Sequence, residues 1–212
     1  MFAMTAGLML RRVASAVPDL TLGVSYLTTW ISPGAFGARS LHYLTLMALL
    51  EFVVIHSAVF MGAVAVGEAP RSTRTALIVG LAVFYSIFVV GFALGLGAWW
   101  PVSAFWLLTL NRLTGVLFST APSGQEKDAM GRDWATSMAL YIGWAFVTVF
   151  APVPRLGITA AVAASNRVPG TGLWIDEPFR LVAFGAAYYL SRGVLELFDP
   201  FAPAAASISP VV

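Results

Sequence analysis

Cysteine is absent from this chain of 212 residues, and charged residues make up only 10% of it. The missing cysteine excludes disulfides, thiolate metal sites, cysteine nucleophiles and iron–sulfur clusters. About a quarter of the residues of a soluble domain are charged, so the low charge content is atypical of a soluble protein. The net charge of +2 is small and its basic residues are scattered, which argues against nucleic acid as a partner.

Histidine and lysine are rare as well. His42 and His56 are the only histidines, and on one helix they would lie about 21 Å apart, which excludes bis-histidine haem ligation. A haem or pigment held by His56 alone stays an open alternative to the absence of any cofactor. Lys127 is the only lysine and falls in a predicted loop, which excludes a retinal-type Schiff base within a span.

Sequence motifs for catalysis are lacking too. The chain has no His-Glu-x-x-His, no Gly-x-Ser-x-Gly and no P-loop. The sequence therefore predicts no metal site and no catalytic residue.

Long apolar runs dominate what is present. Hydrophobic residues make up 59% of the chain, and the mean hydropathy is +0.84. A helix needs about 20 apolar residues to cross a bilayer, and five segments meet this: 41–66, 75–98, 102–119, 134–153 and 181–201. Residues 20–31 form a shorter, more polar candidate. The fold class is therefore all-α, a polytopic transmembrane helical bundle of six spans, with five as the alternative.

Three regions divide the chain. Residues 1–17 are predicted to form an interfacial amphipathic helix, with Leu8, Leu10, Val13 and Val17 toward lipid and Arg11 and Arg12 toward headgroups; a frayed terminus is the alternative. Residues 18–201 are predicted to form a single transmembrane helical domain, and residues 202–212 a flexible tail.

Proline, glycine and charge mark the breaks between spans. Residues 121–133 are predicted to be a loop, and Trp99-Trp100-Pro101 a very tight turn near an interfacial aromatic belt. Within the long connection 154–180, the apolar stretch 157–164 is expected to form a half-helix.

The distribution of basic residues gives a weak topology signal. With six spans and the N-terminus inside, the inner side holds six basic residues: Arg11, Arg12, Arg71, Arg74, Lys127 and Arg132. The outer side holds four: Arg39, Arg155, Arg167 and Arg180. The excess favours cytoplasmic N- and C-termini.

Six polar residues fall inside predicted spans: Glu51, His56, Asn111, Arg112, Arg192 and Glu196. Charges at the bilayer centre are costly and should find partners inside the bundle. Glu51 and Arg112 lie ten residues into their spans and Arg192 eleven, so we expect these three at one level. His56 and Glu196 lie fifteen residues in, one turn deeper, with Glu196 on the face of Arg192. We therefore expect these residues to form a buried network. The network either only fixes helix packing or has a functional role, in which a carboxyl group takes up a proton.

Two further groups of residues are candidates for contacts. Gly91 and Gly95 form a GxxxG pair with Gly80 three turns earlier, which is expected to let another helix approach closely, either within this chain or between copies. Trp174, Asp176, Glu177 and Arg180 precede the last span, where Asp176 is expected to cap the helix; a ligand-gripping loop is the alternative.

The run Leu50-Glu51-Phe52-Val53-Val54-Ile55 resembles a span of an uncharacterised bacterial family of small multi-pass membrane proteins, and the segment 178–197 is similar to the C-terminal span of that family. His56 stands where that family would be expected to have a small residue. The resemblance implies a bacterial inner-membrane protein and carries over no activity.

Two classes of function follow as hypotheses. The first is a non-enzymatic accessory or scaffold component that packs against membrane-protein partners, or against its own copies, in the lipid bilayer. The alternative is a small transporter or proton-linked carrier that uses Glu51 and the arginines. A membrane-embedded enzyme acting on lipid is the second alternative.

Overall fold

The computed structural model describes residues 2–118, 124–167 and 170–198. In these ranges the chain is all helical and contains no strand. Its helices are α1 (Phe2–Ile31), α2 (Ser40–Val66), α3 (Arg71–Leu96), α4 (Trp100–Phe118), α5 (Gly124–Phe150), α6 (Ala160–Ser165), α7 (Leu173–Asp176) and α8 (Pro178–Phe198). The predicted tail at 202–212 lies outside the described residues.

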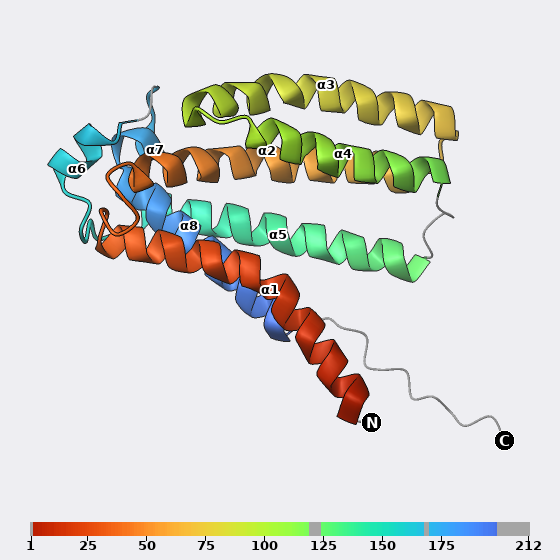
Figure 1. The fold of residues 1–212 in the computed structure, drawn as a ribbon, viewed down its shortest axis with the longest axis horizontal. Helices are drawn as coiled ribbons and strands as arrows, with labels where there is room; N and C mark the ends of the chain where they lie inside the picture. Colours follow the sequence, from red (N-terminus) through yellow and green to blue (C-terminus); the bar gives the residue numbers. More distant parts are fainter. Residues whose placement is uncertain (1, 119–123, 168–169, 199–212) are drawn as a thin grey trace.

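The long helices run back and forth in two groups, and the short helices α6 and α7 lie together at one end (Figure 1). Helix α3 packs against α2 and α4, whereas α8 packs against α1 and α5 and also reaches α2. Helix α2 therefore joins the two groups. The buried apolar residues divide in the same way, with Tyr26, Tyr141 and Phe184 in one cluster and Ile78 and Phe105 in the other.

Four helices in the described residues, α2, α3, α4 and α8, are long and apolar enough to cross a membrane. This composition is typical of an integral membrane protein with several spans. The six predicted spans are not confirmed, because α1 and α5 fall short of the same criterion. Both carry charge, at Asp19 in α1 and at Asp128, Arg132 and Asp133 in α5.

The first two predicted segments of the chain form one helix. Helix α1 continues from Phe2 to Ile31 with Pro18 inside it, so the expected break between residues 17 and 20 was wrong. Proline kinks a helix without necessarily ending it, and Figure 1 shows the axis of α1 changing direction part-way along. Leu10, Val13 and Val17 are exposed, whereas the side chains of Leu8 and Arg11 lie outside the described part. An interfacial location is not confirmed.

The predicted loop at 121–133 is another correction. Helix α5 begins at Gly124, ten residues before the predicted start. Glutamine, lysine, alanine and methionine are good helix formers, and these ten mostly polar residues add almost three turns beyond the apolar part of the helix. Hydropathy marks where apolar residues begin, which need not be where a helix begins.

A tight turn between α3 and α4 is confirmed, but it lies at residues 97–99, and Trp100 and Pro101 of the predicted turn already belong to α4. Helix α3 ends at Leu96 and α4 begins at Trp100. Gly97 adopts a left-handed conformation with φ of 65°, and its N–H bonds to the carbonyls of Ala93 and Leu94. Glycine is the residue that takes this conformation without steric cost.

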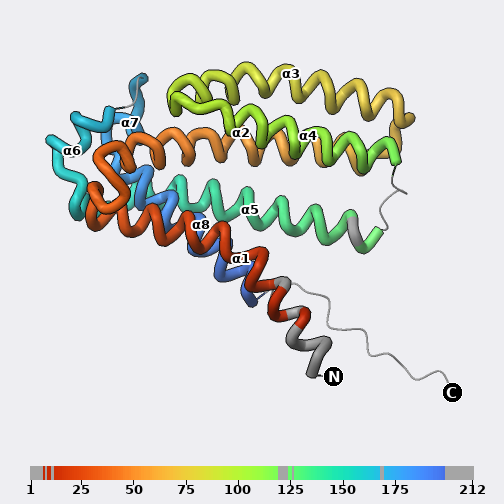
Figure 2. Tube along the Cα trace, in the orientation of Figure 1, coloured from red at the N-terminus to blue at the C-terminus, as the bar shows by residue number. Residues whose placement is uncertain are grey.

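The most extensive contact between described helices joins α1 to α8, which run antiparallel (Figure 2). A Cβ added to Gly23 would lie 2.7 Å from Leu190 Cγ, and one added to Gly193 would lie 2.6 Å from Leu20 Cγ. Small residues let helix backbones approach in this way. Within the chain the α3 glycines take little part in such contacts, because Gly80 and Gly91 have open space beside them and only Gly95 meets another helix, at Leu46. Their expected role in a contact between copies stays a prediction.

The long connection after α5 folds back onto the end of α1. Gly157 N–H donates to the Trp30 carbonyl at 3.0 Å, and Trp30 Nε1 donates to the Pro154 carbonyl at 2.9 Å. The predicted half-helix at 157–164 is shorter than expected, since α6 covers only Ala160–Ser165. Thr159 caps it by accepting a bond from Val162 N–H.

Candidate functional site

Arg192 is the centre of a polar cluster that joins three helices. Its guanidinium pairs with Glu196 of α8 at 3.0 Å, with Asp19 of α1 at 3.3 Å and with Asp133 of α5 at 3.6 Å. It also donates to the hydroxyl of Ser137 in α5. We call Asp19, Asp133, Ser137, Arg192 and Glu196 the Arg192 cluster.

The Arg192 cluster is partly exposed and unbalanced in charge. The side chains of Arg192, Asp19 and Glu196 are 20%, 20% and 24% exposed, and Asp133 is 66% exposed. The expected buried Glu/Arg/His network is therefore not confirmed: Arg192 and Glu196 do pair, but the cluster is partly exposed and does not include His56. Three carboxylates surround one guanidinium, so with all groups ionised the cluster carries excess negative charge.

Glu51 approaches this cluster without forming an ion pair in the described part of the chain. Its carboxyl lies near the Tyr189 side chain and within electrostatic range of Arg192 and Asp19. Glu51 was expected to join Arg192 in one network, but Asp19, Asp133 and Glu196 are the carboxylates that pair with the guanidinium.

Arg112 and Asn111 lie apart from the Arg192 cluster. Helix α4 packs against α3 and the nearby face of α2, and Arg112 Nη1 contacts Met61 Sδ at 3.5 Å. Among the described residues no carboxylate pairs with Arg112, and Asn111 is exposed. The expected common level of Glu51, Arg112 and Arg192 did not bring them together, because equal depth does not fix which helices are neighbours.

His56 faces aromatic rings instead of ionisable partners. Its ring lies 4.3 Å from that of Phe52 and 6.2 Å from that of Phe60. It lines a groove of about 710 Å³ between α2, α3 and α5, to which α7 contributes Trp174. We call this the aromatic groove; its walls include Phe52, Phe84, Phe88, Tyr141, Phe146 and Trp174.

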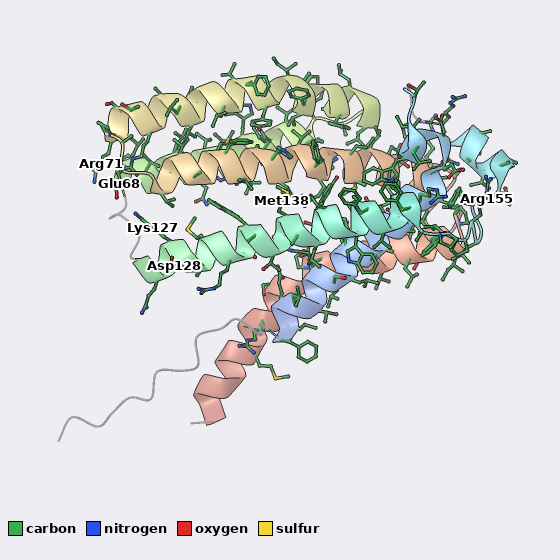
Figure 3. All side chains as sticks on the ribbon, turned by 180° about the vertical axis from the view of Figure 1, so that it is seen from behind. Glu68, Arg71, Lys127, Asp128, Met138 and Arg155 are labelled. Carbon is green, nitrogen blue, oxygen red and sulfur yellow. The ribbon has the colours of Figure 1, made fainter. Side chains whose placement is uncertain are left out.

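Helix packing explains why the aromatic groove exists. Helix α3 packs on α2 and α4, and α5 packs on α8 and α2. The space beside α2, between α3 and α5, is thus left open. Met138, which lies along the middle of α5 in Figure 3, lines this groove. A second hollow, of about 520 Å³, shares Leu49, Ala145, Phe146 and Trp174 with it and extends to residues 171–175.

The residues before α8 hold the loop in place. Asp176 accepts a bond from Gly172 N–H at 3.2 Å and lies 3.8 Å from Arg167, so it was wrongly expected to cap α8. Glu177 pairs with Arg180. Arg180 also donates to the carbonyls of Thr148 and Ala151 at 2.8 and 3.0 Å, at the C-terminal end of α5.

Replacing Arg180 by alanine should lower the free energy of unfolding by about 2 kcal/mol, since a partly buried cation at a helix C-terminus contributes up to about that much. The matched control is Arg167→Ala, whose ion pair is 66% and 53% exposed and should be close to neutral. Thermal unfolding of both variants in nanodiscs measures the difference. Equal midpoints would show that Arg180 does not hold the end of α5.

In the described ranges, no group of three histidine, cysteine or acidic side chains could hold a metal ion. Four residues of the site were missed from the sequence: Asp19, Asp133, Ser137 and Tyr189. Asp19 was placed before a span and Asp133 in a loop. One feature of the sequence could have indicated their role: Asp19 and Asp133 each lie within one turn of an apolar helix segment, where an arginine on a neighbouring helix can reach them.

Comparisons with protein-family models, with curated protein sequences and with solved structures found no match to this chain.

Proposed function

We propose that this chain is an integral membrane protein of six spans with both termini on the cytoplasmic side. The packing of α1 along α8 supports a sixth span, because a helix that contacts a membrane-crossing neighbour along its length shares its depth. Helix α5 likewise lies beside α8 and α2. Arg71 and Lys127 lie at one end of the bundle and Arg155 at the other (Figure 3), as the predicted topology requires. The sequence resemblance supports a bacterial inner membrane.

We further propose a non-enzymatic accessory role in which the bundle packs against membrane partners. This proposal rests on one observation: neither the aromatic groove nor the second hollow beside it is lined by Glu51, Arg112 or any member of the Arg192 cluster. A carrier needs its ionisable groups on an access path. In this structure Arg192 instead ties α1 and α5 to α8, which is what a packing role requires.

A proton-linked carrier is the second candidate, favoured by the excess of carboxylates around Arg192. Proton flux into liposomes that contain the purified chain and a pH-sensitive dye distinguishes the two roles. The accessory role predicts no proton flux above that of protein-free liposomes, for the parent and for Glu51→Gln alike. Flux in the parent that Glu51→Gln abolishes would overturn the accessory role. Gentle purification with mass spectrometry of the co-purifying proteins then names the partner.

A further inference from the structure

Two nitrogen atoms on residues of the aromatic groove have no hydrogen-bond partner among the described residues: His56 Nδ1 and Trp174 Nε1. Each is shielded from contact by neighbouring atoms. An unsatisfied polar group is costly at membrane depth, where water is scarce. An indole N–H is only a donor, and an imidazole nitrogen donates in one tautomer. Acceptor atoms on a bound molecule would satisfy both.

A row of rings connects these two residues. His56 lies 4.3 Å from Phe52, which lies 5.9 Å from Tyr141. Phe184 continues the row at 4.8 Å from Tyr141 and 4.9 Å from Trp174. All distances join ring centroids and fall in or near the range of favourable aromatic contacts. Phe184 itself is fully buried, whereas Phe52, Tyr141, His56 and Trp174 line the groove. Flat molecules suit such walls, because they can stack on ring faces or meet ring edges.

The aromatic groove and the second hollow beside it both lack charged residues. Neither is lined by a lysine, arginine, aspartate or glutamate. A phosphate or carboxylate headgroup would enter without a counter-charge and lose its hydration, which is strongly unfavourable. The chemistry of the walls therefore selects a neutral molecule, and the volume of about 710 Å³ lies within the usual range for small-molecule sites.

We infer that the aromatic groove binds a neutral, membrane-soluble molecule with a flat ring that carries hydrogen-bond acceptors, which is the chemistry of a prenylated quinone. The quinone ring lies among the aromatic side chains, and its carbonyl oxygens accept from Trp174 and His56 after these rings turn toward it. Its apolar chain runs along the open side of the groove. This inference needs the bundle to lie in a membrane but does not depend on the accessory role.

Binding of decylubiquinone to the full chain in phosphatidylcholine nanodiscs tests this inference. Decylbenzene is the matched ligand, because it keeps a ring and the chain but has no carbonyl group. We expect decylubiquinone to raise the thermal midpoint and decylbenzene to do so far less. An azido-quinone should photolabel peptides that contain residues 52–56, 138–146 or 173–175. Equal stabilisation by both ligands, or labelling confined to other peptides, would overturn the inference.

Two variants and two matched controls assign the acceptor contacts. Trp174→Phe and His56→Leu should each weaken decylubiquinone binding roughly fivefold, the equivalent of one neutral hydrogen bond. Trp99→Phe and His42→Leu remove the same residue types outside the groove and should leave binding unchanged. The unliganded midpoint of each variant shows that it has folded. If both groove variants fold and bind like the parent, the proposed contacts do not exist, whatever the proton-flux result.

Discussion

Replacing Gly185 by alanine should lower the free energy of unfolding by about 2 kcal/mol, the usual range for overpacking a tight interior. An added Cβ would lie 2.5 Å from two ring atoms of Tyr26. Tyr26 cannot easily move, because it is fully buried, stacks on Tyr189 at 5.5 Å and donates to the Leu44 carbonyl at 2.7 Å. The new methyl group must therefore push α1 and α8 apart.

Gly80→Ala is the matched control on α3. Nothing lies within 4 Å of the position its Cβ would take, and alanine is favoured over glycine within a helix by up to about 1 kcal/mol. The two variants should move the thermal midpoint in nanodiscs in opposite directions. If Gly185→Ala proved as stable as Gly80→Ala, the close contact of α1 with α8 would be disproved.

Replacing Arg192 by leucine should produce the largest loss, about 3 kcal/mol, because breaking an ion pair leaves a charge with no partner. Asp19 and Glu196 are mostly shielded from solvent and would lose their counter-charge, whereas Asp133 is 66% exposed and should lose little. Accumulation in the membrane and the thermal midpoint in nanodiscs are the measurements.

Replacing Asp19 and Glu196 by their amides as well should recover part of the lost stability. The triple variant Arg192→Leu, Asp19→Asn, Glu196→Gln is expected to lie between the single variant and the parent. Arg112→Leu is the matched control, since the partner of Arg112 is Met61 and not an acid, and it should lose much less. If Arg192→Leu were as stable as the parent, the Arg192 cluster would not hold α1, α5 and α8 together.

Proximity along the chain explains which contacts were predictable. Arg192 and Glu196 lie one turn apart on one helix, so helix geometry alone placed them together, and they do pair. The turn between α3 and α4 was likewise readable to within about two residues, because Trp99-Trp100-Pro101 separates two apolar runs. In both cases the residues that interact are close in sequence.

Contacts between helices were not readable in the same way. Depth placed Glu51, Arg112 and Arg192 at one level, but α4 lies on the far side of α2 from α8. The GxxxG on α3 was visible in the sequence, yet the close approach uses Gly23, Gly185 and Gly193, which have no motif spacing. A helix surface shows small or polar residues, but not which helix will face them.

The sequence by itself determined that the chain is helical and rich in membrane-crossing segments, because apolar run length decides what can satisfy its backbone within a bilayer. It also determined most helix limits in the apolar regions. The tertiary structure alone decided that Asp19 and Asp133 share Arg192 with Glu196, and that His56 faces an aromatic groove. The reason is that hydropathy is a property of each segment, whereas the choice of neighbour depends on side-chain packing between segments far apart in the chain.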